Sequence, residues 1–269
     1  MKNYQLFDCI TFFRENFISN LRFEILNDVV DFFVICEAQY DHLGKKKLFN
    51  FQLKNKKFKN KILYIKMYDK LPLSMNPWER QAYQRDFMLR NLKKIALPND
   101  CILFSDPDEI PNPKKLKNLN LKKKYAIFFQ KHFVYKLNVF NQYDTPWSGT
   151  RACLLKNLES IDFMRQKVLI KNLKKWWRPD KEKSIQIVRD GGWHFNNLFS
   201  PKEISIKLKT FAHQEFAEDK YSDVKIIKKK IMNLEDLFDR NQKFMKISFN
   251  KSYPEYILKN KKKFKKFII

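Results

Sequence analysis

The residues best suited to chemistry lie in one short segment, Cys101 to Pro111, with the sequence CILFSDPDEIP. Its apolar start is typical of a buried strand, and the carboxylates Asp106, Asp108 and Glu109 follow. Ligands in open α/β sheets bind beyond the carboxyl ends of such strands, so we expect Asp106 and Asp108 at the edge of a site. Their hard oxygens suit Mg²⁺ or Mn²⁺, and the implied reaction is metal-assisted displacement of a phosphate-bearing group. The alternative is that these acids only form the turn after the strand.

Strands and helices that could position this segment alternate in the first part of the chain. An asparagine, a proline and a glutamate at positions 76, 77 and 79 predict the start of a helix. The resulting rhythm is typical of a nucleotide-binding half-sheet. We predict strands over residues 6–13, 32–38, 62–68 and 101–105, and helices over residues 15–27 and 77–96.

The second part of the chain has a different pattern. Residues 126–140 and 150–155 are rich in strand-forming side chains and predict antiparallel strands, so the whole sheet should be mixed. A second capping signature at Ser200 predicts a helix that runs toward His213. Weaker helical patterns cover residues 224–234 and 256–263.

The length of 269 residues allows one large α/β domain or two small ones, and we expect one because neither a linker nor a repeat is visible. Within it we expect a nucleotide-binding half over residues 1–111, an acceptor and metal half over residues 112–215, and a basic helical segment over residues 216–269.

The chain is strongly basic, with 55 Lys and Arg against 29 Asp and Glu and a formal net charge of +26. This balance allows a metal-dependent nucleic-acid-binding protein or nuclease that uses the acidic cluster and a lysine-rich surface. Most of the basic residues are lysines, whereas base recognition relies on the arginine fork, and abundant Lys, Asn, Ile and Phe are typical of an AT-rich genome. We therefore expect no specific nucleic-acid partner.

The four cysteines are scattered and show no zinc or redox spacing. The start of the chain reaches Asp8 before an apolar signal core develops, and no run approaches the roughly 18 apolar residues of a membrane span. These features predict a cytoplasmic protein, with membrane association at the inner face as an additional possibility.

Several segments, in order along the chain, resemble glycosyltransferase family 17, the family of β-1,4-mannosyl-glycoprotein β-1,4-N-acetylglucosaminyltransferases. Each motif is weak alone, but together they span the chain from end to end. The matching segments are Phe7–Phe13, Asp31–Ala38, Pro77–Arg80 with Gln84-Arg85, Ser105–Pro111, Trp147–Arg151, Gly191–Phe195 and Tyr253–Asn260.

The resemblance implies a GT-A-like nucleotide-sugar-binding fold, with a mixed, mostly parallel central sheet flanked by helices. It also implies a UDP-sugar donor, expected to be UDP-N-acetylglucosamine, a glycan or glycolipid acceptor, and inversion at the anomeric carbon. Mn²⁺ or Mg²⁺ held by Asp106 and Asp108 would stabilise the charge on the departing diphosphate. His194 is the candidate for a further metal ligand, and the alternative is a hydrogen-bonded structural histidine.

Several residues in the matching segments are candidates to bind the donor. Glu37 ends a predicted strand where GT-A proteins place an acid near the uridine, and Arg85 and Arg151 could reach the diphosphate. The donor-binding candidates are Thr11, Glu37, Arg85, Asp106 and Arg151.

Inversion requires a carboxylate that accepts the proton of the attacking hydroxyl. The sequence offers Glu215, at the end of a predicted helix, and then Asp190 and Glu109. The basic segment at residues 259–267 could also lie on an anionic membrane and bring the enzyme to a lipid-linked acceptor, or be a solvated helix face.

Overall fold

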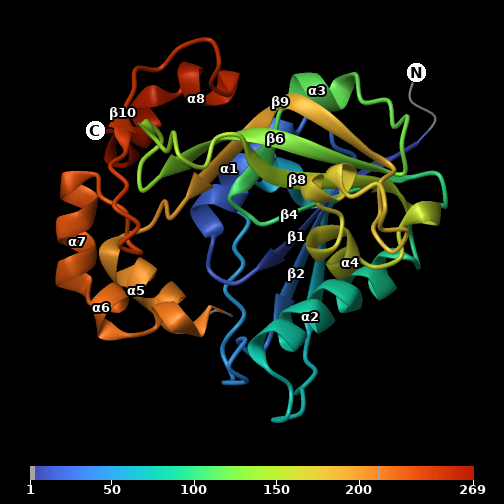
Figure 1. Cartoon of the computed structure of the whole chain (residues 1–269), viewed down its shortest axis with the longest axis horizontal. Helices are drawn as coiled ribbons and strands as arrows, with labels where there is room; N and C mark the ends of the chain where they lie inside the picture. The colour runs from blue at the N-terminus through green and yellow to red at the C-terminus, as the bar shows by residue number, and fades with distance from the viewer. Residues whose placement is uncertain (1–3, 211–212) are drawn as a thin grey trace.

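The computed structural model describes residues 4–210 and 213–269, and Figure 1 shows their course along the chain. Its centre is a ten-stranded sheet in the order β10-β7-β6-β8-β4-β1-β2-β3, in which β9 pairs with both β5 and β6. The strands are β1 (Leu6–Phe12), β2 (Phe32–Ala38), β3 (Ile62–Met67), β4 (Cys101–Ser105), β5 (Glu109–Pro111), β6 (Tyr125–Val134), β7 (Val139–Phe140), β8 (Trp147–Leu154), β9 (Ile185–Asn196) and β10 (Met245–Lys246).

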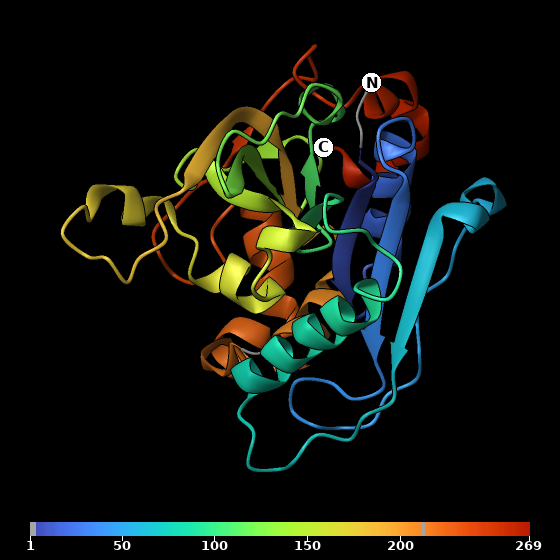
Figure 2. The same cartoon turned by 90° about the vertical axis from the view of Figure 1, so that its right-hand side faces the viewer.

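The helices lie on both faces of this sheet (Figures 1 and 2). The α-helices are α1 (Asn16–Leu26), α2 (Pro77–Leu92), α3 (Pro113–Lys117), α4 (Ile161–Gln166), α5 (Pro201–Thr210), α6 (Asp219–Ser222), α7 (Val224–Asn233) and α8 (Glu255–Lys259). The 3₁₀ helices are η1 (Lys56–Lys61), η2 (Leu155–Asn157), η3 (Ile170–Lys174), η4 (Gln214–Phe216) and η5 (Lys261–Phe267).

Strands β1, β2, β3 and β4 are parallel to one another, as the unbroken apolar runs predict. Alternate side chains of β2 enter two different cores: Phe33 joins the core that contains α1, and Val34 joins the core that contains α2 and α4. Because both faces of β2 are covered, nearly every position of this strand is apolar, and its one charged residue, Glu37, lies next to its end. The predicted mixed α/β architecture flanked by helices is confirmed.

The second half contains two described strands that the sequence pattern did not predict, the long strand β9 and the two-residue strand β10. The predicted antiparallel pairing is present between β6 and β8, but β6 also pairs in parallel with the twelve-residue strand β9. Asp190 and Gly192 interrupt β9 with φ values of 50° and 143°, and the register with β6 shifts there. This irregularity breaks the alternation of side chains by which a strand is found in a sequence.

The starts of the helices agree with the sequence predictions better than their ends do. Asn76 Oδ1 accepts from the backbone N–H of Glu79 at 3.0 Å, and the Asn76 N–H donates to the Glu79 carboxylate at 2.7 Å. Helix α2 nevertheless ends at Leu92, four residues before the predicted end. Helix α5 begins at Pro201 as predicted and ends at Thr210, and part of its predicted continuation lies outside the described residues. No helix within the described ranges is long and apolar enough to span a membrane.

Candidate active site

A cavity of about 640 Å³ opens beyond the carboxyl ends of the parallel strands. Residues at or just beyond the carboxyl ends of β1, β2 and β4 line it, and they include Thr11, Ala38, Asp106 and Asp108. The structure therefore places the Asp106–Asp108 segment at the edge of a site, where its position after a buried strand predicts it. Residues from α2, α4, α5 and the second half of the sheet complete the wall.

A buried arginine, Arg22, fixes the segment that carries Asp106 and Asp108. Arg22 on α1 is fully buried and donates to both carboxylate oxygens of Asp8 on β1, at 2.5 and 2.6 Å. It also donates to the carbonyl of Glu109 at 2.6 Å and to the hydroxyl of Ser105 at 3.0 Å. One guanidinium thus joins α1, β1 and the connection between β4 and β5, which fixes the backbone that carries Asp106 and Asp108.

Arg165 on α4 is the direct partner of two of the three acids. Its Nη2 donates to Asp106 Oδ2 and to Glu109 Oε1, at 2.7 Å each. Burial alone would raise the pKa of Asp106, but the charges of Arg165 and Arg85 outweigh it and lower that pKa. Asp106 is therefore ionised at neutral pH, and its other oxygen lies 4.0 Å from Arg85.

Asp108 faces a different set of basic groups. His194 Nε2 lies 3.5 Å from Asp108 Oδ1, and Lys207 Nζ lies 3.8 Å from Asp108 Oδ2. Burial opposes ionisation, but His194 and Lys207 together lower the pKa of Asp108. The predicted neighbours Asp108 and His194 are thus brought together, because Glu109 on β5 pairs in register with His194 on β9.

Aromatic rings extend this cluster along the cavity. The His132 and His194 rings stack with centroids 4.4 Å apart, and the Trp147 ring lies 4.7 Å from His194. Burial first, and then the charge of His194, lower the pKa of His132 to about 2, so this imidazole is neutral. Asp144 lies at the far end of the row, with Oδ2 3.9 Å from His132 Nδ1.

The predicted donor-binding residues divide into two groups. Thr11, Arg85 and Asp106 line the cavity, and Arg85 is held by Asp162 at 2.7 Å. Glu37 and Arg151 are not among its lining residues.

Glu37 and Arg151 instead make internal contacts. The Glu37 carboxylate accepts from the backbone of Asn50 and Phe51, from Lys47 and from the Tyr64 hydroxyl, so it anchors the loop after β2. Arg151 donates to the carbonyls of Ser148 and Gly149, and burial together with the charge of Arg165 lowers its pKa to about 9.

The predicted general bases lie outside the cavity wall. Glu109 is fully buried between Arg165 and the Trp147 indole N–H, which donates to it at 2.6 Å. Asp190 is exposed in the irregular part of β9. Glu215 is more than half exposed and pairs with His213 at 2.7 Å. None of these three carboxylates is among the described residues that line the cavity, and their role as the base stays a prediction.

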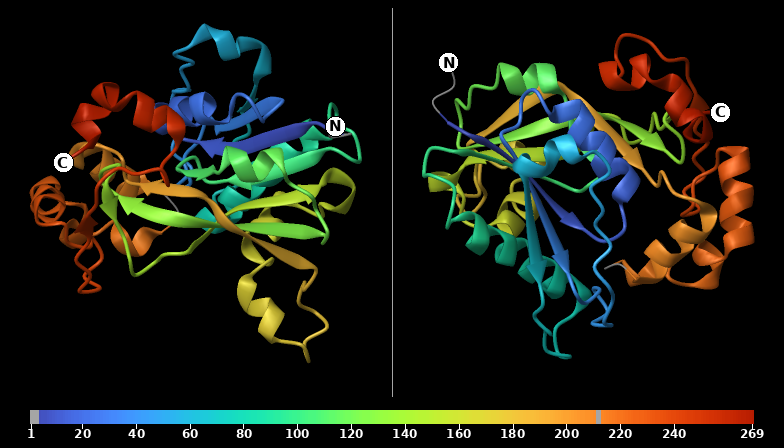
Figure 3. Two further views of the ribbon diagram at one scale, coloured as in Figure 1. Left: turned by 90° about the horizontal axis from the view of Figure 1, so that it is seen from above. Right: turned by 180° about the vertical axis from the view of Figure 1, so that it is seen from behind.

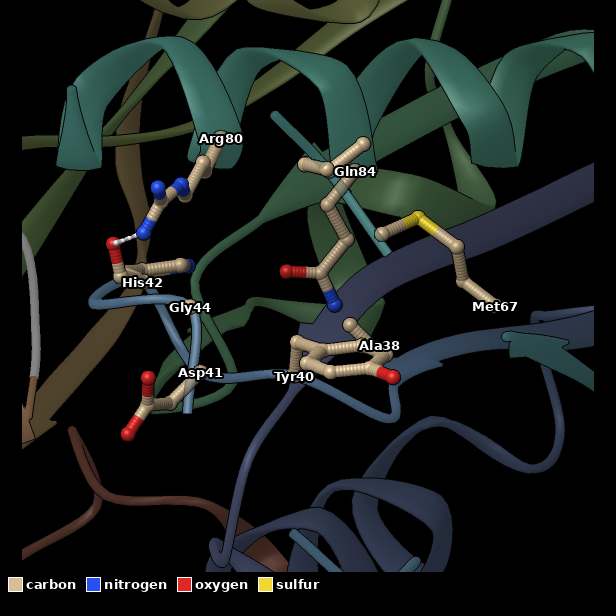
Figure 4. Close-up of a pocket in the computed structure, with 9 residues that line it drawn as sticks. Ala38, Tyr40, Asp41, His42, Gly44, Met67, Arg80 and Gln84 are labelled. Atoms are coloured by element: carbon tan, nitrogen blue, oxygen red, sulfur yellow. Dashed lines mark hydrogen bonds between the residues drawn. The ribbon is translucent and has the colours of Figure 1, made fainter. Parts of the chain in front are cut away.

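One end of the cavity continues into a smaller pocket beneath α2 (Figure 4). There the guanidinium of Arg80 donates to the carbonyl of His42 at 3.3 Å, and Gln84 donates to the carbonyl of Cys36 at 2.9 Å. Gly44 has a φ of 81°, and a Cβ at this position would lie 2.6 Å from the Arg80 guanidinium. A glycine at this turn lets Arg80 hold the loop after β2 against the cavity.

The donor set around Asp108 fits a divalent cation in its chemistry, with carboxylate oxygens and one imidazole nitrogen. Nδ1 of His194 is buried without a hydrogen-bond partner among the described residues, while its ring packs against those of His132 and Trp147 and its Nε2 lies 3.5 Å from Asp108, so Nε2 is the atom that would face a cation there. Within the same part of the chain, no three His, Cys, Asp or Glu side chains already converge as a metal site. Because Asp106 Oδ2 already accepts from Arg165, the Asp106 carboxylate would have to bind both Arg165 and the ion.

The sequence profile described as glycosyltransferase family 17 matches residues 1–268. The chain belongs to this family. The family resemblance found in the motifs is thereby confirmed, and the acidic segment described above lies inside the matched region.

Curated relatives of this family-17 chain include the β-1,4-mannosyl-glycoprotein 4-β-N-acetylglucosaminyltransferases of Homo sapiens and Rattus norvegicus. Each is 27% identical over 224 residues, which cover 73% of this chain and 41% of the relative. The chain thus spans about two fifths of the length of these relatives.

Solved structures with a similar course of the chain include two at low identity. Glucosyl-3-phosphoglycerate synthase from Mycobacterium tuberculosis, in complex with Mn²⁺, UDP-glucose and phosphoglyceric acid, is 11% identical with a TM-score of 0.40, over 95% of this chain and 92% of that one. A glycosyltransferase involved in glycosylation of the major capsid of PBCV-1 is 10% identical with a TM-score of 0.32, over 69% and 81% of the two chains.

Proposed function

We propose that this chain transfers a sugar, expected to be N-acetylglucosamine, from a UDP-sugar to a hydroxyl of a glycan acceptor, with inversion and with a divalent cation. One observation carries the proposal. Asp106 and Asp108 line the same cavity as three basic side chains, Arg85, Arg165 and Lys207. This combination of acids and bases suits a diphosphate together with its cation.

The basic residues would hold the diphosphate of the donor. Arg85 and Arg165 lie beside Asp106, and Lys207 lies beside Asp108. When the donor binds, these three basic side chains could pair with the diphosphate oxygens in place of the two carboxylates. Asp106, Asp108 and His194 are the residues that would hold Mn²⁺ or Mg²⁺. When bound, the ion supplies Lewis-acid stabilisation of the charge on the leaving phosphate.

We assign the general base to Asp144 because of its position and its solvent access. It lines the cavity, and its side chain is 30% exposed. Among the described residues, the side-chain contacts of Asp144 involve one carboxylate oxygen, Oδ2, which accepts from the Asn141 amide at 3.1 Å and lies 3.6 Å from Arg240. Glu15 and Asp41 instead hold backbone groups, since Glu15 accepts from Phe13 and Arg14, and Asp41 accepts from Leu43 and Lys45. In this proposal Asp144 accepts the proton of the acceptor hydroxyl as that oxygen attacks the anomeric carbon and the bond to UDP breaks.

The test is calorimetry with UDP and UDP-N-acetylglucosamine, with and without Mn²⁺, together with measurement of UDP release in the presence of candidate oligosaccharides. We expect the cation to tighten UDP binding at least about tenfold, and Asp108→Asn to remove that gain. Asp180→Asn, a change of an exposed carboxylate remote from the cavity wall, is the matched control.

Two results would argue against the proposal. Equal UDP binding with EDTA and with Mn²⁺ would remove the cation from the mechanism while leaving the transferase assignment to the UDP-release assay. Failure to bind any UDP-sugar, combined with steeply salt-dependent binding of DNA or RNA, would favour the nucleic-acid alternative instead.

A further inference from the structure

The loop between α4 and β9 presents large apolar side chains to solvent. We call residues 171–183 the Trp loop. Within it, the side chains of Trp176 and Trp177 are 82% and 59% exposed, and Leu173 is 39% exposed. Figure 2 shows this yellow segment projecting from the body of the molecule, and the left panel of Figure 3 shows the same projection from above. Two adjacent exposed tryptophans are costly to leave in water, so their exposure calls for a binding role.

The Trp loop is a folded structure that holds these rings outward. The buried Asn172 donates from its side-chain amide to the carbonyls of Lys167 and Glu182, at 2.7 and 3.2 Å, and so joins the two legs of the loop. Successive backbone bonds from Lys175, Arg178 and Lys181 to the residue three positions earlier form tight turns around the tip. The exposure of the two rings therefore results from the fold of the loop.

The surroundings of the two tryptophans are basic. The loop carries the cationic residues Lys171, Lys174, Lys175, Arg178, Lys181 and Lys183. Its two acids are engaged, because Asp180 pairs with both Arg178 and Lys181, and Glu182 pairs with Lys124 at 3.3 Å. Lys122 and Lys123 lie beside the base of the loop, where their backbone N–H groups donate to the side chain of Gln186. Exposed aromatic rings are thus surrounded by excess positive charge.

We propose that the Trp loop docks the protein on an anionic lipid bilayer. Tryptophan rings favour the headgroup level of a membrane, where one part of the ring is apolar and the N–H meets water. Lysines near the surface add electrostatic attraction to anionic lipids, and apolar and basic contacts together give the two signals that stable peripheral binding requires. The basic residues of the Trp loop suit the anionic headgroups, and its two tryptophans suit the interfacial layer of the same bilayer.

Two other assignments explain the loop less well. The loop is no sugar platform of the cavity, since none of residues 171–183 is among the described residues that line it. The basic segment Lys261–Phe267 lacks outward aromatic rings: Phe264 is 6% exposed, and Phe267 stacks on Phe17 at 3.8 Å. That segment offers lysines alone, whereas the Trp loop offers lysines and rings.

The experiment is sedimentation of the whole chain with vesicles of phosphatidylcholine alone, or with about one third phosphatidylglycerol. We expect binding to the anionic vesicles, with at least about tenfold weaker partitioning for Trp176→Ser/Trp177→Ser. Brominated lipid should quench the tryptophan fluorescence of the parent chain, and this quenching should be lost in the double variant. Circular dichroism and a thermal melt check that the variant is folded.

Matched variants locate the contact. Leu48→Ser/Leu73→Ser changes two residues that are each 84% exposed elsewhere and should leave partitioning unchanged. Lys262→Gln/Lys263→Gln tests the C-terminal segment and should have little effect. The proposal is overturned if the parent does not bind anionic vesicles, or if the Trp176→Ser/Trp177→Ser variant binds them as well as the parent does. Binding of single-stranded DNA that depends on the two tryptophans, without vesicle binding, would assign the loop to nucleic acid instead.

Discussion

Arg165 and Asp106 form an ion pair of 2.7 Å at the wall of the cavity, although 59 positions separate them in the chain. The same guanidinium holds Glu109, so α4 is fastened to the connection between β4 and β5 through two carboxylates. Burial acts to lower the pKa of Arg165, but Asp106 and Glu109 outweigh it and raise that pKa, which keeps the guanidinium charged. Arg165 thus makes both a structural contact, with the buried Glu109, and a contact at the candidate site, with Asp106.

The first prediction concerns the structural part of this contact. Arg165→Gln should lower the free energy of unfolding by about 3–5 kcal/mol, because the fully buried Glu109 would lose its charged partner. Urea denaturation measures the change. Lys57→Gln, which breaks the exposed pair with Glu24, should leave the midpoint nearly unchanged and serves as the control. An Arg165→Gln variant as stable as the parent would mean that Glu109 does not depend on this charge.

A second prediction concerns the buried pair of Arg22 and Asp8. Arg22→Met should cost about 3–5 kcal/mol, since it leaves the buried Asp8 carboxylate without its counter-charge. Asp8→Leu/Arg22→Met should recover most of that loss, because two apolar side chains need no desolvated partner. Denaturant unfolding of the two variants and of Asp8→Leu completes a double-mutant cycle. A double variant no more stable than Arg22→Met would show that the bonds of Arg22 to Ser105 and Glu109 dominate.

Much of the parallel half of the fold could be predicted because local signals agree with it. The strand at residues 101–105 is apolar throughout and occurs as predicted, and the Asn76 cap marks the start of α2. The ends of helices have weaker signals, since neither a glycine nor a proline follows Leu92 within three positions to mark the end of α2. Strand β9 could not be predicted, because Asp190 and the adjacent glycines interrupt the alternation that identifies a strand.

The candidate site was only partly predictable for a related reason. Asp106 and Asp108 follow a recognisable strand, but Arg165 lies on the six-residue helix α4 and reaches the acids only through tertiary packing. His132 did leave a signal, because Gln130 and His132 are polar residues two positions apart in a strand that is apolar except for them and Lys131. Such a pair on one face of a strand indicates a polar environment inside the fold.

A third prediction tests the proposed base. Asp144→Asn should lower kcat for sugar transfer about 10²–10⁴-fold with little change in KM for the donor, because an amide accepts no proton from the acceptor. Asp190→Asn and Glu215→Gln change carboxylates outside the cavity and should keep parental kcat. Initial rates of UDP release measure all three. Loss of activity in Asp190→Asn or Glu215→Gln, with normal rates in Asp144→Asn, would reverse the assignment.

The last prediction is a pH dependence of stability that originates at His132. Its pKa in the folded protein is about 2, against about 6.5 for an ordinary histidine. Between these values the unfolded chain binds a proton that the folded chain excludes, so stability must fall as the pH falls. The expected slope from this residue is about 1.4 kcal/mol per pH unit below about pH 6.

This slope can be separated from those of the carboxylates. Asp106 and Asp108 have lowered pKa values, so their contributions are lost only below about pH 4. We therefore expect urea unfolding between about pH 6 and pH 5 to show a shallower dependence in His132→Gln than in the parent, by the stated slope. The comparison uses slopes, so a general loss of stability in the variant does not affect it. Parallel lines for the two proteins would mean that His132 is protonated in the folded chain, and that the stack with His194 carries charge.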